Sequence, residues 1–453
     1  MIFSRVESRG LAHLSYFLGD GGEAVVIDPR RDVDAYVEIA RQNCMRITHV
    51  LETHRNEDYV SGSLELEART GCKAYHGRGL PFRYGEYIDD GEELEAGGLR
   101  IKAVRTPGHT PESMTYVAYS GGTALMAFTG DALFAGATGR TDFWGKEGEA
   151  AGTLYDSLME KILPLGDHVM LCPAHGAGSV CGSGISERQY STLGHERRTN
   201  PDLQLSRDDF IAKKASEHLE VPPYFKQMES YNLNGPPVTG GPSVPAPMSS
   251  GEFRAAIKDG SLIDGRMPSS FSAHIPGSYN ISLDGLATWP GWVASYDKPI
   301  YLVLERDADA DVAARYLYRL GFDDVGGYLC GGFQRWLMAG YETGFTGLLV
   351  PDALAGLLSI NKATVLDVRS DGEWMKGHIK EAIHIFVGSL EHRVHEVPRK
   401  KPVVCVCSTG MRASLAASIL KRAGINEVYN LLGGITAWKA KDYPLVYEGL
   451  AVR

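Results

Sequence analysis

The chain has 453 residues, of which 43% are hydrophobic and 23% charged, and its formal net charge is −10. This length predicts roughly three domains of 100 to 200 residues, each able to bury its own core. The negative charge gives no electrostatic basis for binding nucleic acid or anionic lipid, so the expected partner is a small molecule.

Membrane insertion and secretion are also not expected. No apolar run approaches the roughly 18 residues of a membrane helix, and Met1-Ile2-Phe3-Ser4-Arg5 does not open a secretory signal. The seven cysteines are scattered and form no Cys-x-x-Cys pair. They predict a reducing, cytoplasmic location. The sequence leaves open whether the protein forms a homo-oligomer.

In chain order, the first predicted elements are two strands at 14–18 and 24–27 around a turn at 19–22. A helix follows at 33–42, then a strand at 47–51 and a helix at 61–70 closed by Gly71. Further strands are predicted at 101–105, 124–128 and 168–172, each ending beside glycine or proline. Strand and helix alternate, which indicates an α/β fold.

Four of these strand ends carry polar residues that suit a metal ion. They are His54 with Asp58, then His109, Asp131 and His175. One histidine at a strand end is more often a structural residue, but four such ends in order favour a metal site. Imidazole and carboxylate together suit zinc, iron or manganese, and two histidines with one carboxylate form the facial triad of non-haem iron oxygenases.

These motifs carry a resemblance. Thr53-His54-x-x-x-Asp58, Thr106-Pro107-Gly108-His109, Thr129-Gly130-Asp131 and Pro173-Ala174-His175-Gly176 resemble the metallo-β-lactamase superfamily. Gly139-Arg140-Thr141-Asp142-Phe143 resembles its persulfide dioxygenase branch, whose members oxidise a thiol persulfide to sulfite and thiol with one iron and O2. The resemblance implies an N-terminal αββα sandwich.

Carried over residue by residue, the resemblance implies that His54, His109 and Asp131 hold one Fe(II), with zinc as the alternative. Asn56 and Tyr59 stand where binuclear hydrolases of the superfamily have histidines, which argues against a two-metal site. Asp58 and His175 are then expected to orient the ligands or bound water.

The first domain is predicted to span 1–234, with a last helix at 207–219 that could cap it. A segment rich in proline and glycine at 235–247 predicts a linker. Beyond it the chain repeats itself, because Leu262-Ile263-Asp264-Gly265-Arg266 answers Val365-Leu366-Asp367-Val368-Arg369. The repeat predicts two α/β domains, at 248–345 and 346–453.

In the last copy, the strand 403–406 runs into Cys407-Ser408-Thr409-Gly410-Met411-Arg412, and a helix is predicted to begin near Ala413. Consecutive backbone N–H groups, the helix N-terminus and Arg412 favour an anion at the Cys407 sulfur. Cys407 and Arg412 are therefore predicted to be catalytic, and Ser408, Thr409, Gly410 and Met411 to bind the substrate.

This loop resembles the rhodanese sulfurtransferases, which carry sulfane sulfur as a cysteine persulfide. The resemblance implies that Cys407 accepts sulfur from a donor such as thiosulfate and passes it to a thiol. In the middle copy Leu304 stands opposite Cys407, followed by the acidic segment Glu305-Arg306-Asp307-Ala308-Asp309. That copy is therefore predicted to be an inactive rhodanese-like domain.

Together the resemblances imply a fusion of persulfide dioxygenase and rhodanese in sulfide metabolism, acting on a thiol persulfide, O2 and thiosulfate. Two alternatives remain open. One is a mononuclear zinc thioester hydrolase fused to rhodanese, and the other, motivated by Asn56, is a metal-free N-terminal scaffold for the sulfurtransferase. The sequence also leaves open whether the thiol is glutathione, coenzyme A or another carrier, and the direction of sulfur transfer.

Overall fold

The computed structural model describes residues 1–143, 145–217 and 219–447. The last six residues of the predicted domain 346–453 therefore lie outside the described residues. Contacts divide the chain into two compact units, Met1–Pro242 with Tyr318–Gly321, and Ser243–Leu317 with Phe322–Arg453. Among the described residues, none of the helices combines the length and apolar character needed to cross a membrane.

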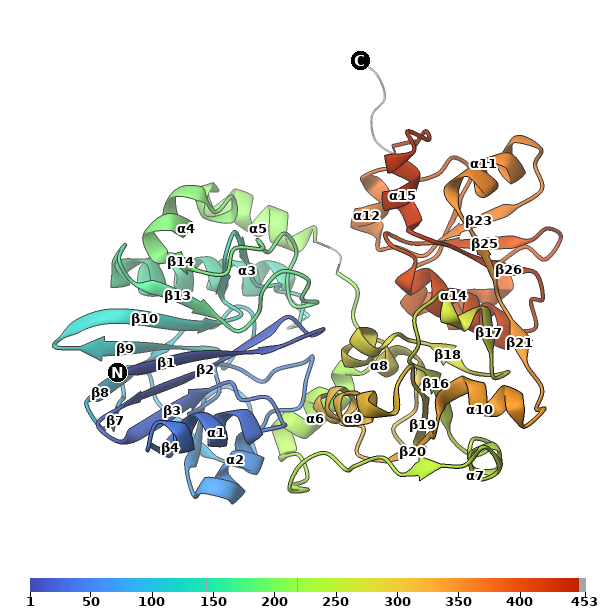
Figure 1. The fold of residues 1–453 in the computed structure, drawn as a ribbon. Helices are drawn as coiled ribbons and strands as arrows, with labels where there is room; N and C mark the ends of the chain where they lie inside the picture. Colours follow the sequence, from blue (N-terminus) through green and yellow to red (C-terminus); the bar gives the residue numbers. More distant parts are fainter. Residues whose placement is uncertain (144, 218, 448–453) are drawn as a thin grey trace, which may run out of the picture. The chain divides into compact units, whose positions relative to one another are not determined.

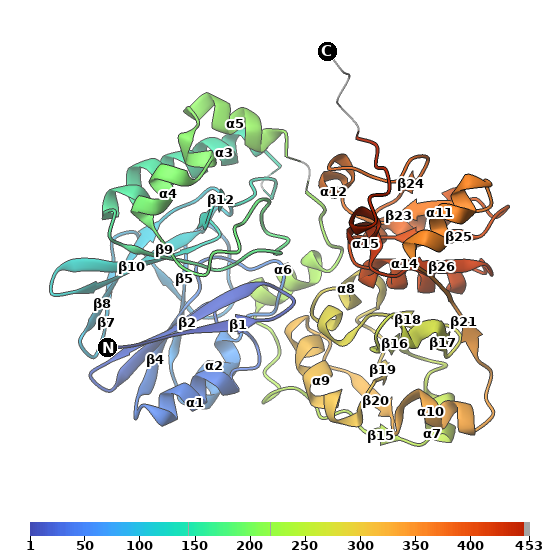
Figure 2. The ribbon, with the colours of Figure 1, turned by 45° about the horizontal axis from the view of Figure 1, so that its top comes forward.

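The first unit is built on two six-stranded sheets (Figures 1 and 2). The first sheet has the order β1 (Ile2–Ser8), β2 (His13–Asp20), β3 (Glu23–Ile27), β4 (Arg46–Leu51), β5 (Lys73–Gly77) and β6 (Glu86–Ile88). The second has the order β14 (Ser191–Thr192), β13 (Met170–Pro173), β10 (Thr123–Gly130), β9 (Met114–Ser120), β8 (Leu99–Arg105) and β7 (Glu93–Ala96). The strands β11 (Leu133–Phe134) and β12 (Ala137–Thr138) form a separate ribbon.

Helices cover the outer faces of the two sheets (Figure 2). Those on the first sheet are α1 (Asp34–Gln42) and α2 (Ser63–Thr70), and those on the second are α3 (Glu147–Asp156), α4 (Leu193–Thr199) and α5 (Arg207–Ala215). After α3 the chain continues through a π-helix at Ser157–Ile162 and a 3-10 turn at Leu163–Leu165, and α6 (Phe225–Asn234) is the last helix of this unit.

Three apolar clusters hold these layers together. One lies between the sheets and includes Leu18, Ile27, Ile101 and Phe128. The other two join each sheet to its helices, because alternate strand residues point outward and meet helix side chains. Truncating a fully buried residue of these clusters, such as Phe128, to alanine costs about 3–5 kcal/mol of folding free energy. The predicted αββα sandwich is confirmed.

The structure corrects several predicted boundaries. The turn predicted at 19–22 contains only Gly21 and Gly22, because Gly19 pairs with Ala24 and Asp20 with Glu23 in the hairpin. Both turn glycines have positive φ, which this tight two-residue connection requires. The helix predicted at 207–219 ends at Ala215, and residue 218 of that prediction lies outside the described residues.

The second unit contains two five-stranded parallel sheets of the same topology. The first has the order β15 (Pro247–Met248), β20 (Val325–Leu329), β19 (Ile300–Val303), β16 (Ser261–Asp264) and β18 (Tyr279–Asn280). The second has the order β22 (Gly347–Leu349), β26 (Val428–Leu431), β25 (Val403–Val406), β23 (Thr364–Asp367) and β24 (Ile383–His384). The strands β17 (Ala273–His274) and β21 (Gly344–Phe345) pair separately.

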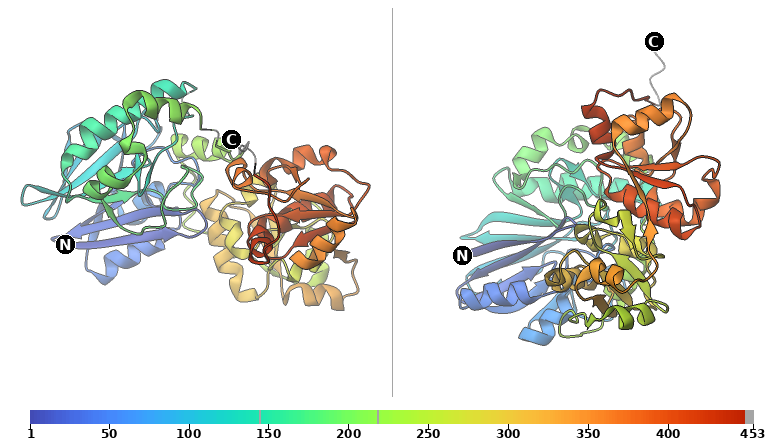
Figure 3. Two further views of the ribbon diagram at one scale, coloured as in Figure 1. Left: turned by 90° about the horizontal axis from the view of Figure 1, so that it is seen from above. Right: turned by 45° about the vertical axis from the view of Figure 1, so that its right-hand side comes forward.

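Each copy carries its own helices, and in Figure 3 the first copy is yellow to gold and the second orange to red. The helices of the first are α7 (Ser250–Ala256), α8 (Pro290–Val293), α9 (Ala310–Arg319) and α10 (Gly332–Met338). Those of the second are α11 (Pro351–Ser359), α12 (Asp371–Met375), α13 (Leu390–Arg393), α14 (Met411–Arg422) and α15 (Gly434–Ala440). Short 3-10 turns lie at 202–204, 270–272, 283–287, 307–309, 387–389 and 394–396.

A buried ion pair shows the repeat at the level of side chains. Arg266 donates two hydrogen bonds to Asp264 at the end of β16, and Arg369 does the same to Asp367 at the end of β23. The two α/β copies predicted from the repeat are confirmed.

Candidate functional site

The structure brings His54, His109 and Asp131 together at one edge of the sandwich. His54 follows β4 of the first sheet, whereas His109 and Asp131 follow β8 and β10 of the second. Oδ2 of Asp131 lies 3.7 Å from Nε2 of His54 and 3.6 Å from Nε2 of His109. All three side chains are buried.

Hydrogen bonds on the other ring nitrogens fix how both imidazoles are presented. Asp28 accepts hydrogen bonds of 2.8 Å from the backbone N–H and from the hydroxyl of Thr53. Since that hydroxyl donates to Asp28, its oxygen accepts from Nδ1 of His54 at 2.8 Å. Nδ1 of His109 donates to the carbonyl of Arg140 at 2.9 Å. In the neutral imidazoles, both Nε2 lone pairs therefore face Asp131.

This arrangement fits a single metal ion. Two donor atoms that each lie about 2.1 Å from one ion are at most about 4.2 Å apart, and both distances to Asp131 satisfy this limit. Nε2 of His54 and Oδ2 of Asp131 are buried and make no hydrogen bond to any residue that the structure describes. Two histidines and one carboxylate suit a divalent transition metal.

The electrostatic environment keeps two of these groups in the form that binds metal. Burial lowers the pKa of His54 to about 4, so this imidazole is neutral at physiological pH. Burial alone would raise the pKa of Asp131, but the surrounding histidines, His175 first, lower it overall. For His109, Glu57 and Asp131 outweigh the effect of burial and raise the pKa. The shifts of Asp131 and His109 reflect neighbouring groups of opposite charge, whereas the shift of His54 reflects its burial.

Asp58 and His175 lie beside the predicted ligands but contact each other. Nε2 of His175 is 2.9 Å from Oδ2 of Asp58, and Nδ1 is 2.7 Å from Oδ1 of Asp131. Burial would lower the pKa of His175, but Asp131 and Asp58 raise it well above its ordinary value. His175 therefore bridges two carboxylates that could otherwise hold a second metal ion, and it holds Asp131 in place.

Asn56 and Tyr59 are also engaged within the protein. The amide of Asn56 donates to the carbonyl of His54 at 3.2 Å. The ring of Tyr59 packs 4.0 Å from that of His13, and its hydroxyl lies 3.4 Å from the carbonyl of Asp28. Cys181 completes a second cluster with Asp58 and His175, but burial raises the pKa of its thiol well above the ordinary value. These features disfavour a binuclear site.

Arg140 braces the loop that follows Asp131. Its guanidinium donates to both carboxylate oxygens of Asp142, at 2.7 and 2.6 Å, and to the carbonyl of Val180 at 3.1 Å. The ring of Phe143 lies 5.2 Å from that of His109. The Gly-Arg-Thr-Asp-Phe motif thus holds both the carbonyl that orients His109 and an aromatic wall beside it.

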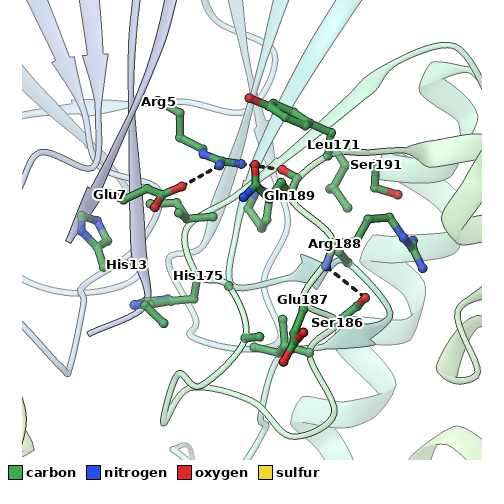
Figure 4. A pocket seen from close by; sticks show the side chains of 18 of the residues that line it. Arg5, Glu7, His13, Leu171, His175, Ser186, Glu187, Arg188, Gln189 and Ser191 are labelled. Carbon is green, nitrogen blue, oxygen red and sulfur yellow. Dashed lines mark hydrogen bonds and ion pairs between the residues drawn. The ribbon is translucent and has the colours of Figure 1, made fainter. Parts of the chain in front are cut away.

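A cleft of about 330 Å³ opens next to His175 (Figure 4). His13 and His175 line it, whereas His54, His109 and Asp131 do not. Two of its arginines are already paired, Arg5 with Glu7 at 2.6 Å and Arg188 with Glu196 at 3.0 Å. The cleft therefore reaches His175 and not the predicted ligands.

Sequence reasoning missed Glu57. This residue is fully buried, and its Oε2 lies 3.7 Å from Nε2 of His109. Donor atoms of His54, Glu57 and His109 all lie within 4.8 Å of one another. A charged residue placed between Asn56 and Asp58, in the loop after a buried strand, was the signal that could have indicated it.

In the second unit, the Cys407 loop connects β25 to α14. Cys407 is 1% exposed, and its sulfur accepts a 3.1 Å hydrogen bond from the N–H of Gly410. Gly410 has φ +99° and precedes Met411, the first helical residue, two positions before the predicted start at Ala413. The backbone therefore turns the N–H of Gly410 toward the sulfur, as the motif predicts.

Glu373 of α12 was also missed. Arg412 donates to its two carboxylate oxygens at 2.6 and 2.7 Å, and the hydroxyl of Ser408 donates at 2.7 Å. Thr409 is exposed at the tip of the loop. The predicted loop residues are thus together, but Arg412 and Ser408 face an internal carboxylate. The capping box from Ser370 to Glu373 was the available signal.

In the middle copy Leu304 follows β19 as Cys407 follows β25. Leu304 is 2% exposed and Asp307–Asp309 form a 3-10 turn after it. A leucine offers no nucleophile at this position.

Comparisons with known proteins identify the families to which these domains are related. Residues 8–175 match the metallo-beta-lactamase superfamily, and residues 249–339 and 350–441 each match the rhodanese-like domain. The mitochondrial persulfide dioxygenase ETHE1 of Bos taurus is 34% identical over 216 residues, which are 46% of this chain and 77% of that protein. The hydroxyacylglutathione hydrolase GloC of Haemophilus influenzae is 28% identical over 208 residues, 41% of this chain and 89% of that protein.

Among solved structures, a metallo-beta-lactamase from Staphylococcus aureus subsp. aureus COL aligns with a TM-score of 0.66 and 29% identity. The alignment covers 73% of this chain and 99% of that one, so the likeness extends beyond the N-terminal sandwich. The chain therefore belongs to the metallo-β-lactamase superfamily as a homologue of the persulfide dioxygenases, and two rhodanese-like domains follow its N-terminal domain.

Proposed function

We propose that the N-terminal domain is a mononuclear non-haem iron persulfide dioxygenase. In the overall reaction, RSSH, O2 and H2O give RSH, sulfite and two protons, so the outer sulfur is oxidised while O2 is reduced. The single observation that carries the proposal is the buried convergence of His54, His109 and Asp131 at distances that fit one ion. The 34% identity to a persulfide dioxygenase supports the choice of reaction.

In this proposal the chain's own residues set up the site before substrate arrives. Thr53 and the carbonyl of Arg140 hold the two imidazoles with their Nε2 atoms toward the centre, and His175 holds Asp131. Bound iron would supply the one-electron chemistry that ground-state O2 requires and that side chains lack. Phe143 beside His109 limits access of water to the site.

We also propose that the last domain is a sulfurtransferase. The Cys407 thiolate attacks the outer sulfur of thiosulfate, which gives a Cys407 persulfide and releases sulfite, and a thiol then takes up the sulfane sulfur. The 3.1 Å hydrogen bond from the N–H of Gly410 to the sulfur of Cys407 supports this assignment. Seven cysteines without a disulfide in the described residues support a reducing cytoplasm as the location.

The dioxygenase proposal is tested by oxygen uptake. Full-length protein is loaded with Fe(II) under anaerobic conditions and given glutathione persulfide, and O2 consumption and sulfite are measured together. We expect one sulfite per O2, and no uptake by His109→Ala. Iron-loaded protein without uptake, or uptake without sulfite, would contradict the proposal.

A zinc thioester hydrolase is the second candidate, supported by the similarity to a hydroxyacylglutathione hydrolase. It requires metal-bound hydroxide and no O2. Hydrolysis of S-lactoylglutathione by zinc-loaded protein, without O2 dependence, would favour it. A chain that takes up neither iron nor zinc would instead act as the metal-free scaffold for the sulfurtransferase.

The sulfurtransferase proposal is tested by transfer of sulfur from thiosulfate to cyanide. We expect Cys407→Ser to lose this activity, because a hydroxyl cannot carry sulfane sulfur. The matched control is Cys330→Ser, since Cys330 is an exposed thiol of the inactive copy. Full activity of Cys407→Ser would refute the assignment.

A further inference from the structure

Glu57 is a buried carboxylate that the proposed triad leaves unexplained. One of its oxygens, Oε1, lies 3.4 Å from the guanidinium of Arg55. The other, Oε2, is buried and makes no hydrogen bond to any residue within the described ranges. A carboxylate oxygen in this environment is costly unless a cation faces it.

Nε2 of His109 faces Oε2 of Glu57. Nε2 of His109 is 3.7 Å away, which is beyond hydrogen-bond distance. Because Nδ1 of His109 donates to the carbonyl of Arg140, a neutral His109 directs its Nε2 lone pair toward Glu57. Two electron-pair donors then face one another, and a metal ion between them would satisfy both.

The geometry places Glu57 beside both predicted imidazole ligands. Donor atoms of His54, Glu57 and His109 lie within 4.8 Å of one another, and the 3.7 Å between Glu57 and His109 matches the 3.6 Å between Asp131 and His109. Glu57 thus approaches Nε2 of His109 at the same range as Asp131.

We infer that Glu57 is a fourth protein ligand and that this chain holds its metal with two histidines and two carboxylates. The inference rests on the proposed mononuclear site and deepens it. The loop that has an amide at Asn56 in place of an imidazole supplies a carboxylate one residue later. Two carboxylates balance the charge of a divalent ion, and their oxygen donors favour iron or manganese over softer ions.

Metal affinity tests this inference without relying on turnover. Metal-free full-length protein is titrated anaerobically with Fe(II), and separately with Co(II), against a chromophoric chelator. We expect Glu57→Gln to weaken binding of both ions by at least about tenfold and to change the visible absorption bands of the Co(II) form. Glu57→Asp keeps the charge but moves the carboxylate oxygen away from the metal. The metal affinity of this variant should therefore lie between that of the wild type and that of Glu57→Gln.

The matched control is Glu229→Gln. Glu229 lies 3.1 Å from the same Arg55 guanidinium but is not among the clustered donors, so its variant should bind both ions like the wild type. Stability of the metal-loaded and metal-free protein provides a second readout. Glu57→Gln should lower the unfolding temperature of the metal-loaded protein by more than that of the metal-free protein, because only the loaded protein loses a ligand, whereas a purely structural role of Glu57 predicts the same decrease in both.

The outcomes separate this inference from the proposed function. Loss of binding in His109→Ala together with wild-type affinity and Co(II) spectrum in Glu57→Gln would overturn the role of Glu57 and leave the triad intact. Wild-type protein that binds neither ion would overturn both. A lower unfolding temperature of metal-free Glu57→Gln with unchanged metal affinity would show that Glu57 is structural.

Discussion

Thr53 illustrates how one hydroxyl connects the fold to the proposed metal site. It donates to Asp28 and accepts from His54, so it determines which nitrogen of His54 carries the proton. Burial raises the pKa of Asp28 to about 7, although its two hydrogen bonds from Thr53 lower it. The orientation of His54 therefore depends on a buried series of hydrogen bonds that runs from Asp28 through Thr53 to His54.

We expect Thr53→Val to keep the fold but weaken anaerobic Fe(II) binding by about 10- to 100-fold, because the ring of His54 loses its partner. The unsatisfied polar groups should also cost about 1–3 kcal/mol of unfolding free energy. Chelator competition measures the affinity. Thr48→Val is the control, since Thr48 contacts the neighbouring His49 in the same way on β4. Equal affinities for the two variants would contradict the proposed role.

At the same scale, the sequence predicted the residues that follow strand ends and missed those whose partners come from elsewhere. The proximity of His54, His109 and Asp131 could be predicted because each follows a strand end and stands in a motif that resembles the metallo-β-lactamase superfamily. Glu57 and Glu373 could not, because their importance depends on which atoms face them after folding. A charged residue is usually solvated, and only the structure shows that Glu57 is buried and that Glu373 accepts two hydrogen bonds from Arg412.

The element that most constrains the site is the end of β10. Gly130 has φ +55°, and a Cβ there would lie 2.6 Å from the hydroxyl and 2.8 Å from Cβ of Thr53. It also sits at a register shift against β13. The strand thus ends in a conformation that lets Asp131 and Thr53 approach together.

Gly130→Ala should therefore destabilise the N-terminal domain by more than the about 1 kcal/mol expected for backbone strain alone, and should lower Fe(II) affinity by displacing Thr53. Gly121→Ala separates the two causes. Gly121 has φ +54° in the turn after β9, but a Cβ there meets nothing within 4 Å. Calorimetry and chelator competition measure both effects, and identical behaviour of the two variants would refute the steric argument.

The short helix α12 carries Glu373, whose contact with the predicted nucleophile loop should make the stability of this domain depend on pH. Burial raises the pKa of Glu373, but Arg412 and Ser408 outweigh it and the pKa falls to about 2. A depressed carboxyl pKa stabilises the fold fully above the ordinary value of 4.5, and this contribution is lost as pH falls toward 2.

Glu373→Gln should accordingly lower the unfolding temperature of the rhodanese transition at pH 7, and the difference from wild type should shrink between about pH 4.5 and 2. Differential scanning calorimetry across this range measures it. Glu396→Gln, which removes an exposed ion pair with Arg393, should change little at any pH. A difference that stays constant down to pH 2 would show that charge is not the cause.

Among elements, segments with a regular apolar period were predicted well, whereas a helix end without such a period was not. The strand at 47–51 and the helix at 33–42 were found almost to the residue, because both carry an apolar face at a regular period. The helix predicted at 207–219 was too long. The residues after Ala215 are mostly polar and carry no apolar pattern that would mark where the helix ends. The two α/β copies could be predicted from the internal repeat, because its matched motifs mark equivalent strand ends in both copies.

At the scale of the whole molecule, all four candidate ligand atoms belong to the first of the two compact units. A ligand that binds only the folded state stabilises that unit by RT ln(1 + [L]/Kd), which is about 2.7 kcal/mol at a free concentration of 100 Kd. For a unit of this size, such a gain raises the unfolding temperature by about 5–10 °C.

Removing the metal should therefore lower one calorimetric transition by about this amount and leave the rhodanese transition in place. The measurement compares metal-free protein with protein in excess Fe(II), both anaerobic. His109→Ala should unfold at the same temperature with and without Fe(II), because its site is incomplete. A shift of the rhodanese transition alone would place the metal in the second unit, and an equal shift in His109→Ala would show that iron binds elsewhere in the first.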